Sequence, residues 1–228
     1  SSDVCSSDLG YVQKTIPLLL ETMRDAGVSA NDVYVVVGGA PDHEQASFSI
    51  DGFRVSACFV THNNFDNTAL IWAVEHLRGY DYAFLLHDTT AVLPGFAERL
   101  LDVPSAHADA AAIRLSDGEP SMSMGWYCVD ALKAAASAIV ALKSDAVGPE
   151  ALQTKAATED AVFEIVAAAG GRVTSIAKGP SSVMAQLVTT HGGVERRVGQ
   201  WDTPEIGRAH VWTPVTFRNL VCRLLLEK

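Results

Sequence analysis

The sequence has no uninterrupted apolar run of the roughly 18 residues that a membrane-spanning helix requires. It is also poor in basic residues, with 17 Lys and Arg against 27 Asp and Glu and a net charge of −10. Phosphate recognition needs a concentrated basic patch, so this scatter argues against a nucleic-acid-binding protein. The four cysteines show neither paired metal spacing nor the density of a disulfide scaffold. We therefore expect a reducing compartment, the cytoplasm or the cytoplasmic face of a membrane, and no membrane segment in this stretch.

What is present is the composition of an ordinary globular protein. The chain has 228 residues, of which 48% are hydrophobic and 19% are charged. This length allows one sizeable hydrophobic core, and a single folded domain is the expected organisation.

The two ends of the chain differ from the rest. Residues 1–9 resemble the forward translation of a common short-read sequencing adapter, and residues 206–228 resemble the opposite adapter, with Trp212 where that adapter carries a TGA codon. We therefore expect the fold in residues 10–205, as a fragment cut at both ends, and no native element in the end segments. The alternative is that residues 220–226 form a genuine amphipathic terminal segment.

Strand-like and helix-like segments alternate along residues 10–205. Runs of β-branched and aromatic residues predict strands, and apolar residues at helical spacing predict helices. The predicted strands are residues 32–37, 55–60, 82–86, 110–115, 122–129 and 173–176, and the predicted helices are residues 16–26, 68–77, 96–101, 130–142 and 159–169. A hairpin turn is expected at Asp51-Gly52. The alternation predicts an α/β fold with a mostly parallel central sheet and helices on both faces.

Two polar clusters punctuate these apolar elements. His87-Asp88-Thr89 ends the strand predicted at residues 82–86, a position at which α/β folds bind ligands. Thr158-Glu159-Asp160 opens the helix predicted at residues 159–169. Each cluster also has a purely structural interpretation, because Asp88 can cap a turn and a hydroxyl followed by acids is typical of a helix N-terminus. Their order and surroundings favour a functional interpretation.

The order and spacing of three motifs resemble those of the GT-A glycosyltransferases, especially the inverting enzymes similar to family 2. The first motif is the apolar strand, short acidic triplet and Pro-Gly-Phe helix start at residues 82–96. The second is a strand running into a helix at residues 124–132, and the third joins residues 158–163 to a glycine-ended turn at residues 169–173. The resemblance covers most of residues 16–176. It implies a GT-A fold whose first strand is missing, and we expect this fragment to be inactive as it stands.

The resemblance also implies a reaction, the transfer of a sugar from a nucleotide-diphosphate donor to an acceptor hydroxyl with inversion. The nucleotide sugar lies at the strand edge, near His87, Asp88 and Thr89, and the acceptor hydroxyl attacks its anomeric carbon. Asp160, with Glu159 beside it, corresponds to the carboxylate that removes the proton. Such general-base help is typically worth ~10²–10⁴-fold in rate.

The metal-binding triplet departs from the family pattern. The family has Asp-x-Asp, whose acids hold Mg or Mn against the diphosphate, whereas His87-Asp88-Thr89 lacks both outer carboxylates. Three outcomes stay open: Asp88 holds the ion alone or with His87, the diphosphate is neutralised without metal, or activity is lost. His191, in a glycine-rich loop, is a second candidate ligand for the metal or diphosphate, with a solvated histidine as the alternative.

Three further residues are candidates for binding. Asn63 and Asn64 follow His62 in the loop after the strand predicted at residues 55–60, where they can touch the nucleotide base or simply belong to a helix-capping loop. Trp126 offers an aromatic face on which an acceptor sugar can stack, or it belongs to the core.

Two other functions fit the same architecture. A nucleotidyltransferase would carry a glycine-rich and basic first loop, which lies upstream of this stretch. A non-catalytic descendant that binds a sugar, nucleotide or protein is favoured by the loss of both outer acids around Asp88. The upstream sequence separates the first from a glycosyltransferase, and the effect of Asp160→Asn on transfer separates the second.

Overall fold

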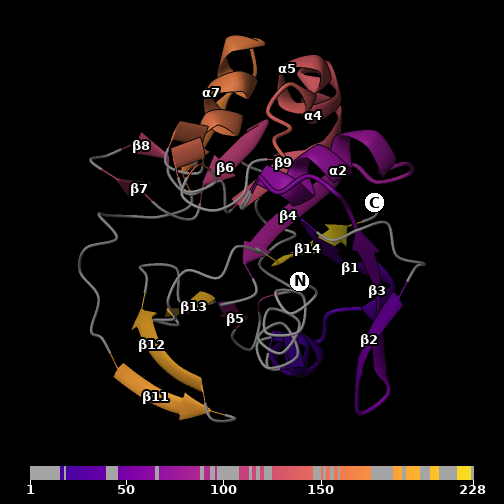
Figure 1. The fold of residues 1–228 in the computed structure, drawn as a ribbon, viewed down its shortest axis with the longest axis vertical. Helices are drawn as coiled ribbons and strands as arrows, with labels where there is room; N and C mark the ends of the chain where they lie inside the picture. Colours follow the sequence, from indigo (N-terminus) through magenta and orange to yellow (C-terminus); the bar gives the residue numbers. More distant parts are fainter. Residues whose placement is uncertain are drawn as a thin grey trace.

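The computed structural model describes most of the central part of the chain and several separate segments (Figure 1). The described residues are 16–17, 19–39, 46–64, 67–87, 90–92, 96, 108–112, 115–116, 119–120, 125–145, 150, 153–154, 157–158, 160–175, 187–191, 194–200, 206–210 and 220–226. In residues 46, 87, 90–91, 112, 115–116, 119–120 and 175, and in the strands from residue 187 onward, only the backbone is described. Strands and helices occur together, which confirms the α/β class.

The central sheet has eight strands in the order β10-β6-β9-β4-β14-β1-β3-β2. These strands are β10 (Val173–Ser175), β6 (Ala110–Ala112), β9 (Gly125–Cys128), β4 (Tyr82–His87), β14 (Leu220–Leu226), β1 (Val33–Val37), β3 (Phe53–Phe59) and β2 (Ala46–Ile50). A four-stranded sheet contains β11 (Leu187–His191), β12 (Val194–Gln200), β13 (Ile206–His210) and β5 (Thr90–Val92). A two-stranded sheet pairs β7 (Leu115–Ser116) with β8 (Glu119–Pro120).

The central sheet is mixed, so the prediction of a mostly parallel sheet is wrong. The pairs β1 with β3 and β6 with β10 are parallel, whereas β2, β9 and β14 run antiparallel to every strand beside them. Because β14 is antiparallel to both β1 and β4, the strands β1, β3 and β4 run in one direction. Their carboxyl ends therefore face the same edge of the sheet.

A tight hairpin explains one of the antiparallel pairs. β2 and β3 are joined by Asp51 and Gly52, and Ile50 pairs directly with Phe53. Both turn residues have positive φ, 44° for Asp51 and 83° for Gly52, as a type I′ turn requires. The hairpin predicted at this dipeptide is confirmed.

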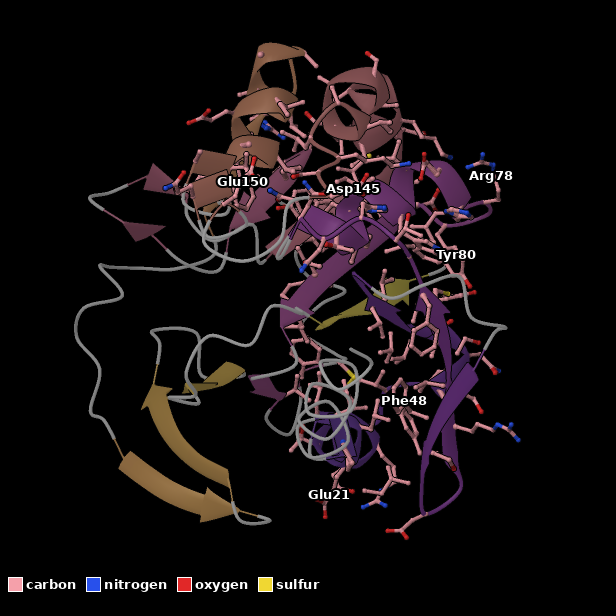
Figure 2. All side chains as sticks on the ribbon, viewed as in Figure 1. Glu21, Phe48, Arg78, Tyr80, Asp145 and Glu150 are labelled. Carbon is pink, nitrogen blue, oxygen red and sulfur yellow. The ribbon has the colours of Figure 1, made fainter. Side chains whose placement is uncertain are left out.

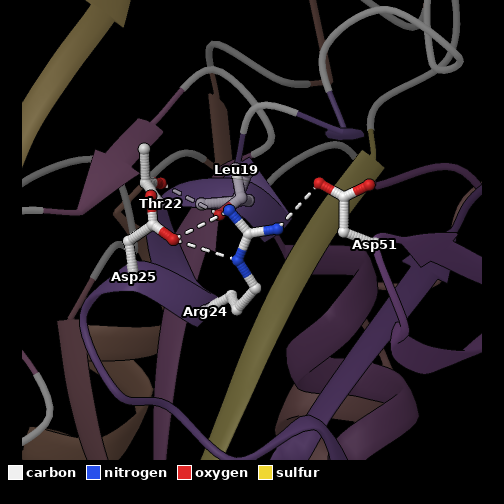
Figure 3. Close-up of polar contacts among 5 residues, drawn as sticks. All are labelled: Leu19, Thr22, Arg24, Asp25 and Asp51. Atoms are coloured by element: carbon white, nitrogen blue, oxygen red, sulfur yellow. Dashed lines mark hydrogen bonds and ion pairs between the residues drawn. The ribbon is translucent and has the colours of Figure 1, made fainter.

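A surface ion pair links the hairpin turn to the first helical segment. Arg24 Nη1 lies 3.0 Å from Asp51 Oδ2, and Arg24 also contacts the carboxylate of Asp25 (Figure 3). Asp51 keeps 79% of its side chain exposed, so solvent screens the attraction. The pair therefore adds little to stability.

One face of the central sheet packs against the helical residues 16–17 and 19–25. Alternate residues of β1, such as Val35, point to this side and form a cluster with Ile16 and Leu19, all fully buried. Phe48 of β2 is partly buried against the same cluster, on the side of the hairpin turned toward the helix that carries Glu21 (Figure 2). The predicted helix at residues 16–26 is confirmed for the described positions.

Four helices cover the opposite face and lie together in the upper half of Figure 1. They are α2 (Thr68–His76), α4 (Val129–Ala134), α5 (Ala136–Val140) and α7 (Ala161–Ala168). Their apolar side chains form a second buried cluster with the residues of β1, β4 and β9 that point away from the first. Helices therefore cover both faces, as predicted. The helix predicted at residues 130–142 is divided in two at Ala135, whose φ of −94° and ψ of 9° leave the helical region.

β14 lies where the sequence predicts no native element. Residues 220–226 belong to the adapter-like end, yet they pair with β1 on one side and β4 on the other. Strands pair through hydrogen bonds between backbone groups, which every sequence has. An extended segment can therefore pair with the exposed backbone of two neighbouring strands whatever its side chains. β1 and β4 are two such strands, since each pairs with β14 along one side. The side chains of Val35, Val36, Phe84 and Leu85 are buried on both faces of these two strands.

Candidate functional site

The buried polar and charged side chains in the described part of the chain all fall within seven consecutive positions. They are His62, Asn63, Asn64, Asn67 and Thr68, with exposed fractions of 6% or less. Burying a polar group costs free energy unless it is hydrogen-bonded, so such a concentration needs a specific network. We refer to the described residues of this stretch, 62–64 and 67–68, as the polar segment.

The polar segment is tied to the carboxyl end of β1. It follows β3 and leads into the first turn of α2, and Gly39 N donates to His62 O at 3.0 Å. A Cβ added at Gly38 would lie 3.0 Å from Thr68 Cγ2 and 3.1 Å from His62 O, so a side chain there would require these neighbours to shift. The glycines that end β1 thus allow the polar segment to close over this edge of the sheet.

Asn64 fixes the polar segment to the chain that follows α5. Its Oδ1 accepts a hydrogen bond from Ser144 N at 3.0 Å, and its Nδ2 donates to Leu142 O. Asn63 N donates to Ser144 O at 3.0 Å, which completes a second link to the same segment. The Asn64 amide therefore holds the polar segment against the chain that follows α5. This is a structural role and not contact with a nucleotide base.

Asn67 brings a second distant segment to the same place. Its Nδ2 donates to Thr158 O at 2.6 Å, across 91 positions of the chain. Thr158 precedes Asp160, the residue at which α7 is capped. The structure thus brings one sequence-predicted site residue, Asp160, into the neighbourhood of the polar segment.

Thr158 is not the N-cap of α7, although a hydroxyl followed by acids is typical of a helix N-terminus. The Thr158 hydroxyl donates to Thr154 O at 2.8 Å, and the N-cap position is occupied by Asp160. Asp160 is half-buried, and its backbone oxygen accepts from Phe163 N at 3.1 Å. Asp160 thus begins a helix whose apolar residues Val162, Phe163 and Val166 are buried.

His62 is the most unusual member of the polar segment. Among the described residues its Nε2 has no hydrogen-bond partner, and the ring is only 6% exposed. Burial lowers the pKa of the imidazole below its ordinary value, and the nearby positive charge of Lys143 lowers it further. Lys143 is itself paired with Glu75 of α2 at 2.7 Å. The neutral ring is therefore the favoured form in the fold.

Trp126 lies in the core. It is 1% exposed and stacks on Tyr82, with ring centroids 4.5 Å apart. An acceptor sugar needs an accessible aromatic face, and this placement offers none. Of the two interpretations of Trp126, the structure favours the core residue over the acceptor platform.

Several predicted site residues lie outside the described residues. Asp88, Thr89 and Glu159 are among them, and of His87 and His191 only the backbone, in β4 and β11, is described. Within the described part of the chain, no three His, Cys, Asp or Glu side chains are grouped as ligands for a metal ion. The metal prediction at Asp88 and His191 thus stays a prediction from sequence.

Sequence reasoning did not single out Asn67. Several asparagines precede an apolar helix in this stretch, a pattern that predicts a helix-capping loop. Nothing in that pattern distinguishes an exposed capping loop from a buried one that holds two distant segments.

Comparison of the chain with protein-family models, with curated proteins and with solved structures finds no match. The resemblance to GT-A enzymes therefore rests on the motifs of the sequence alone. Among the described residues, no helix combines the length and the apolar character needed to cross a membrane.

Proposed function

We propose that this chain is a GT-A-like domain that binds a nucleotide-diphosphate sugar and, in an active protein, transfers the sugar to an acceptor hydroxyl with inversion. The observation that carries the proposal is the common direction of β1, β3 and β4. Gly38-Gly39 follow β1, the polar segment follows β3, and the triplet from His87 to Thr89 begins at the last residue of β4. Ligands of α/β proteins bind at such carboxyl ends.

The proposed reaction assigns a separate task to each part of this edge. Asn63 lines the nucleotide subsite beside Gly39, where a Cβ added to the glycine would lie 3.3 Å from Asn63 Cβ. Asp160 accepts the proton from the acceptor hydroxyl as the acceptor oxygen bonds to the anomeric carbon. The bond between that carbon and the phosphate oxygen breaks, and the nucleoside diphosphate leaves with the electron pair. A divalent cation, with Asp88 and His191 as its predicted ligands, would neutralise the diphosphate.

Binding and turnover test separate parts of the proposal. We expect UDP or GDP to bind the chain in calorimetric titrations, and Asn63→Ala to weaken that binding. Release of nucleoside diphosphate from UDP-glucose, UDP-N-acetylglucosamine and GDP-mannose measures turnover. In any active form, Asp160→Asn lowers turnover by about 10²–10⁴-fold and leaves binding unchanged. Asp130→Asn is the matched control, because Asp130 keeps 92% of its side chain exposed.

The outcomes separate the proposed function from its rivals. Absence of any nucleoside diphosphate binding contradicts the proposal as a whole. Nucleoside diphosphate binding without turnover supports a non-catalytic descendant. Transfer that survives Asp160→Asn shows that Asp160 is not the base. Incorporation of a nucleoside monophosphate from a triphosphate, with release of pyrophosphate, supports a nucleotidyltransferase.

A further inference from the structure

Asn67 joins the beginnings of two helices that are far apart in the sequence. It stands at the N-cap position of α2 with an exposed fraction of 1%, and its amide reaches across to Thr158 O. An N-cap side chain commonly binds the free amides of its own helix. Here the side-chain amide serves another segment, the one that leads into α7.

The start of α7 is consequently held from two sides. On the inner side, Val162 and Phe163 are buried, and Phe163 stacks on Tyr127 of β9 with ring centroids 5.4 Å apart. On the side of the preceding turn, Thr158 is held by Asn67. Asp160 lies between these two points of attachment, so its backbone has little freedom to shift.

We infer that Asn67 is a positioning residue for Asp160, fixing the carboxylate relative to the edge formed by β1 and β3. The chemical consequence rests on the proposed function, in which Asp160 is the general base. A base must come within about 2.6–3.2 Å of the proton it removes. A displacement of about 1 Å can cost about 10²-fold in rate. Asn67 therefore controls transfer while touching neither substrate.

The link lies close to the proposed nucleotide subsite. Asn63 and Asn67 are both buried, and Asn67 N donates to Asn64 O at 3.0 Å. The residue that holds the start of α7 therefore belongs to the same stretch of chain as the proposed nucleotide contact.

Amide hydrogen exchange tests the positioning role without requiring activity. The variant Asn67→Asp keeps the size of the side chain but replaces the donor by a carboxylate that faces the Thr158 carbonyl. We expect exchange in a peptide covering residues 158–164 to rise by about 10-fold, the effect of losing one buried hydrogen bond. Exchange in β3 stays unchanged. Asn31→Asp is the matched control, since Asn31 is exposed in the 3-10 helix Ala30–Asp32.

Transfer provides the second measurement. In an active form, Asn67→Asp lowers kcat by about 10²-fold with the KM for the sugar nucleotide little changed, and the shape of the pH profile is retained. If no form of the protein shows turnover, the proposed function fails while the exchange result still decides the positioning role.

Two outcomes overturn the inference: exchange at residues 158–164 that is the same in Asn67→Asp as in the unmodified chain, or the same increase in Asn31→Asp. Should Asn67→Asp fail to fold, Asn67→Ser replaces it, because its shorter side chain carries no charge and does not span the distance to Thr158. A circular-dichroism spectrum and melting temperature like those of the unmodified chain, with exchange raised only at residues 158–164, then support the positioning role.

Discussion

Asn64 and Ser144 are joined by a hydrogen bond of 3.0 Å from the Ser144 backbone nitrogen to the Asn64 Oδ1, across 80 positions of the chain. The same side chain donates to Leu142 O, so one buried amide satisfies two backbone groups of the segment that follows α5. This relationship makes Asn64 a point at which the stability of the fold and the shape of the candidate site are linked.

Replacing Asn64 should therefore be costly. Asn64→Ala removes the hydrogen bonds that the side chain makes with Ser144 N and Leu142 O, and we expect the free energy of unfolding to fall by about 1–3 kcal/mol. Urea unfolding followed by circular dichroism measures the change. The exposed Asn31→Ala should stay within about 0.5 kcal/mol of the unmodified chain. Equal effects of the two substitutions would show that the Asn64 network contributes nothing.

Two glycines should respond differently to alanine. At Gly52 the φ of 83° strains any side chain, but no atom lies within 4 Å of the added Cβ. We expect Gly52→Ala to cost about 1–2 kcal/mol through the backbone alone. Gly38→Ala instead pushes its Cβ against Thr68 and His62. It should both destabilise the fold by about 1–3 kcal/mol and weaken nucleoside diphosphate binding.

Thermal melts and calorimetric titrations of the two glycine variants check this contrast. Gly52→Ala should melt earlier with its affinity for UDP or GDP retained. If Gly52→Ala loses as much affinity as Gly38→Ala, the weaker binding does not come from the contact between Gly38 and the polar segment, and the prediction is wrong.

Stability should depend on pH through His62. Burial lowers the pKa of the folded imidazole below its ordinary value of 6.5, whereas the unfolded chain titrates near that value. Between the two values the unfolded state binds more protons, so the free energy of unfolding falls as pH drops below about 6.5 and levels off below the folded pKa. Besides burial, the positive charge of Lys143 lowers the pKa of His62, and the negative charges of Glu75 and Asp145 raise it.

A variant isolates this contribution from those of the other titrating groups. The difference in unfolding free energy between the unmodified chain and His62→Gln should shrink as pH is lowered from 8 to 5. Urea unfolding at a series of pH values provides the measurement. A difference that is constant with pH, or that grows in acid, contradicts the expected protonation behaviour of His62.

Cys58 should react slowly in the folded state. Burial raises the pKa of its thiol, and the side chain is only partly accessible in β3. Because the thiolate is the nucleophile, alkylation by iodoacetamide at pH 8 should be about 10-fold slower than in the urea-unfolded chain. Peptide mass spectrometry resolves Cys58 from the other cysteines. Equal rates in the folded and unfolded chain would contradict the burial of this thiol.

The sequence predicts those parts of the fold that local pattern determines. The strand at residues 33–37 is recognisable because both of its faces are buried, and the Asp51-Gly52 turn because few dipeptides tolerate two positive φ values. The directions of β9 and β14 carry no local signal, since strand pairing depends on backbone contacts between distant segments. For that reason the mixed character of the sheet could not be anticipated.

The candidate site could likewise be predicted only where local sequence determines it. Polar residues after β3 mark a loop of interest, and Asn63 and Asn64 were candidates on that basis. The burial of these asparagines depends on packing against distant segments. The hydrogen bond from Asn67 to Thr158 spans 91 positions, and the pattern of residues along the sequence does not reveal either feature. Trp126 illustrates the converse, because an aromatic residue has the same sequence signature in a core as on a binding surface.

The central place of β14 has a consequence for folding kinetics. Val33 and Leu224 are paired although they lie roughly 190 positions apart in the chain, and β14 is the strand through which β1 meets β4. Closing so long a loop is entropically slow, so the two halves of the sheet should form first and join last. Until then the edges of β1 and β4 present open backbone groups, the kind of surface from which aggregation of folding intermediates starts.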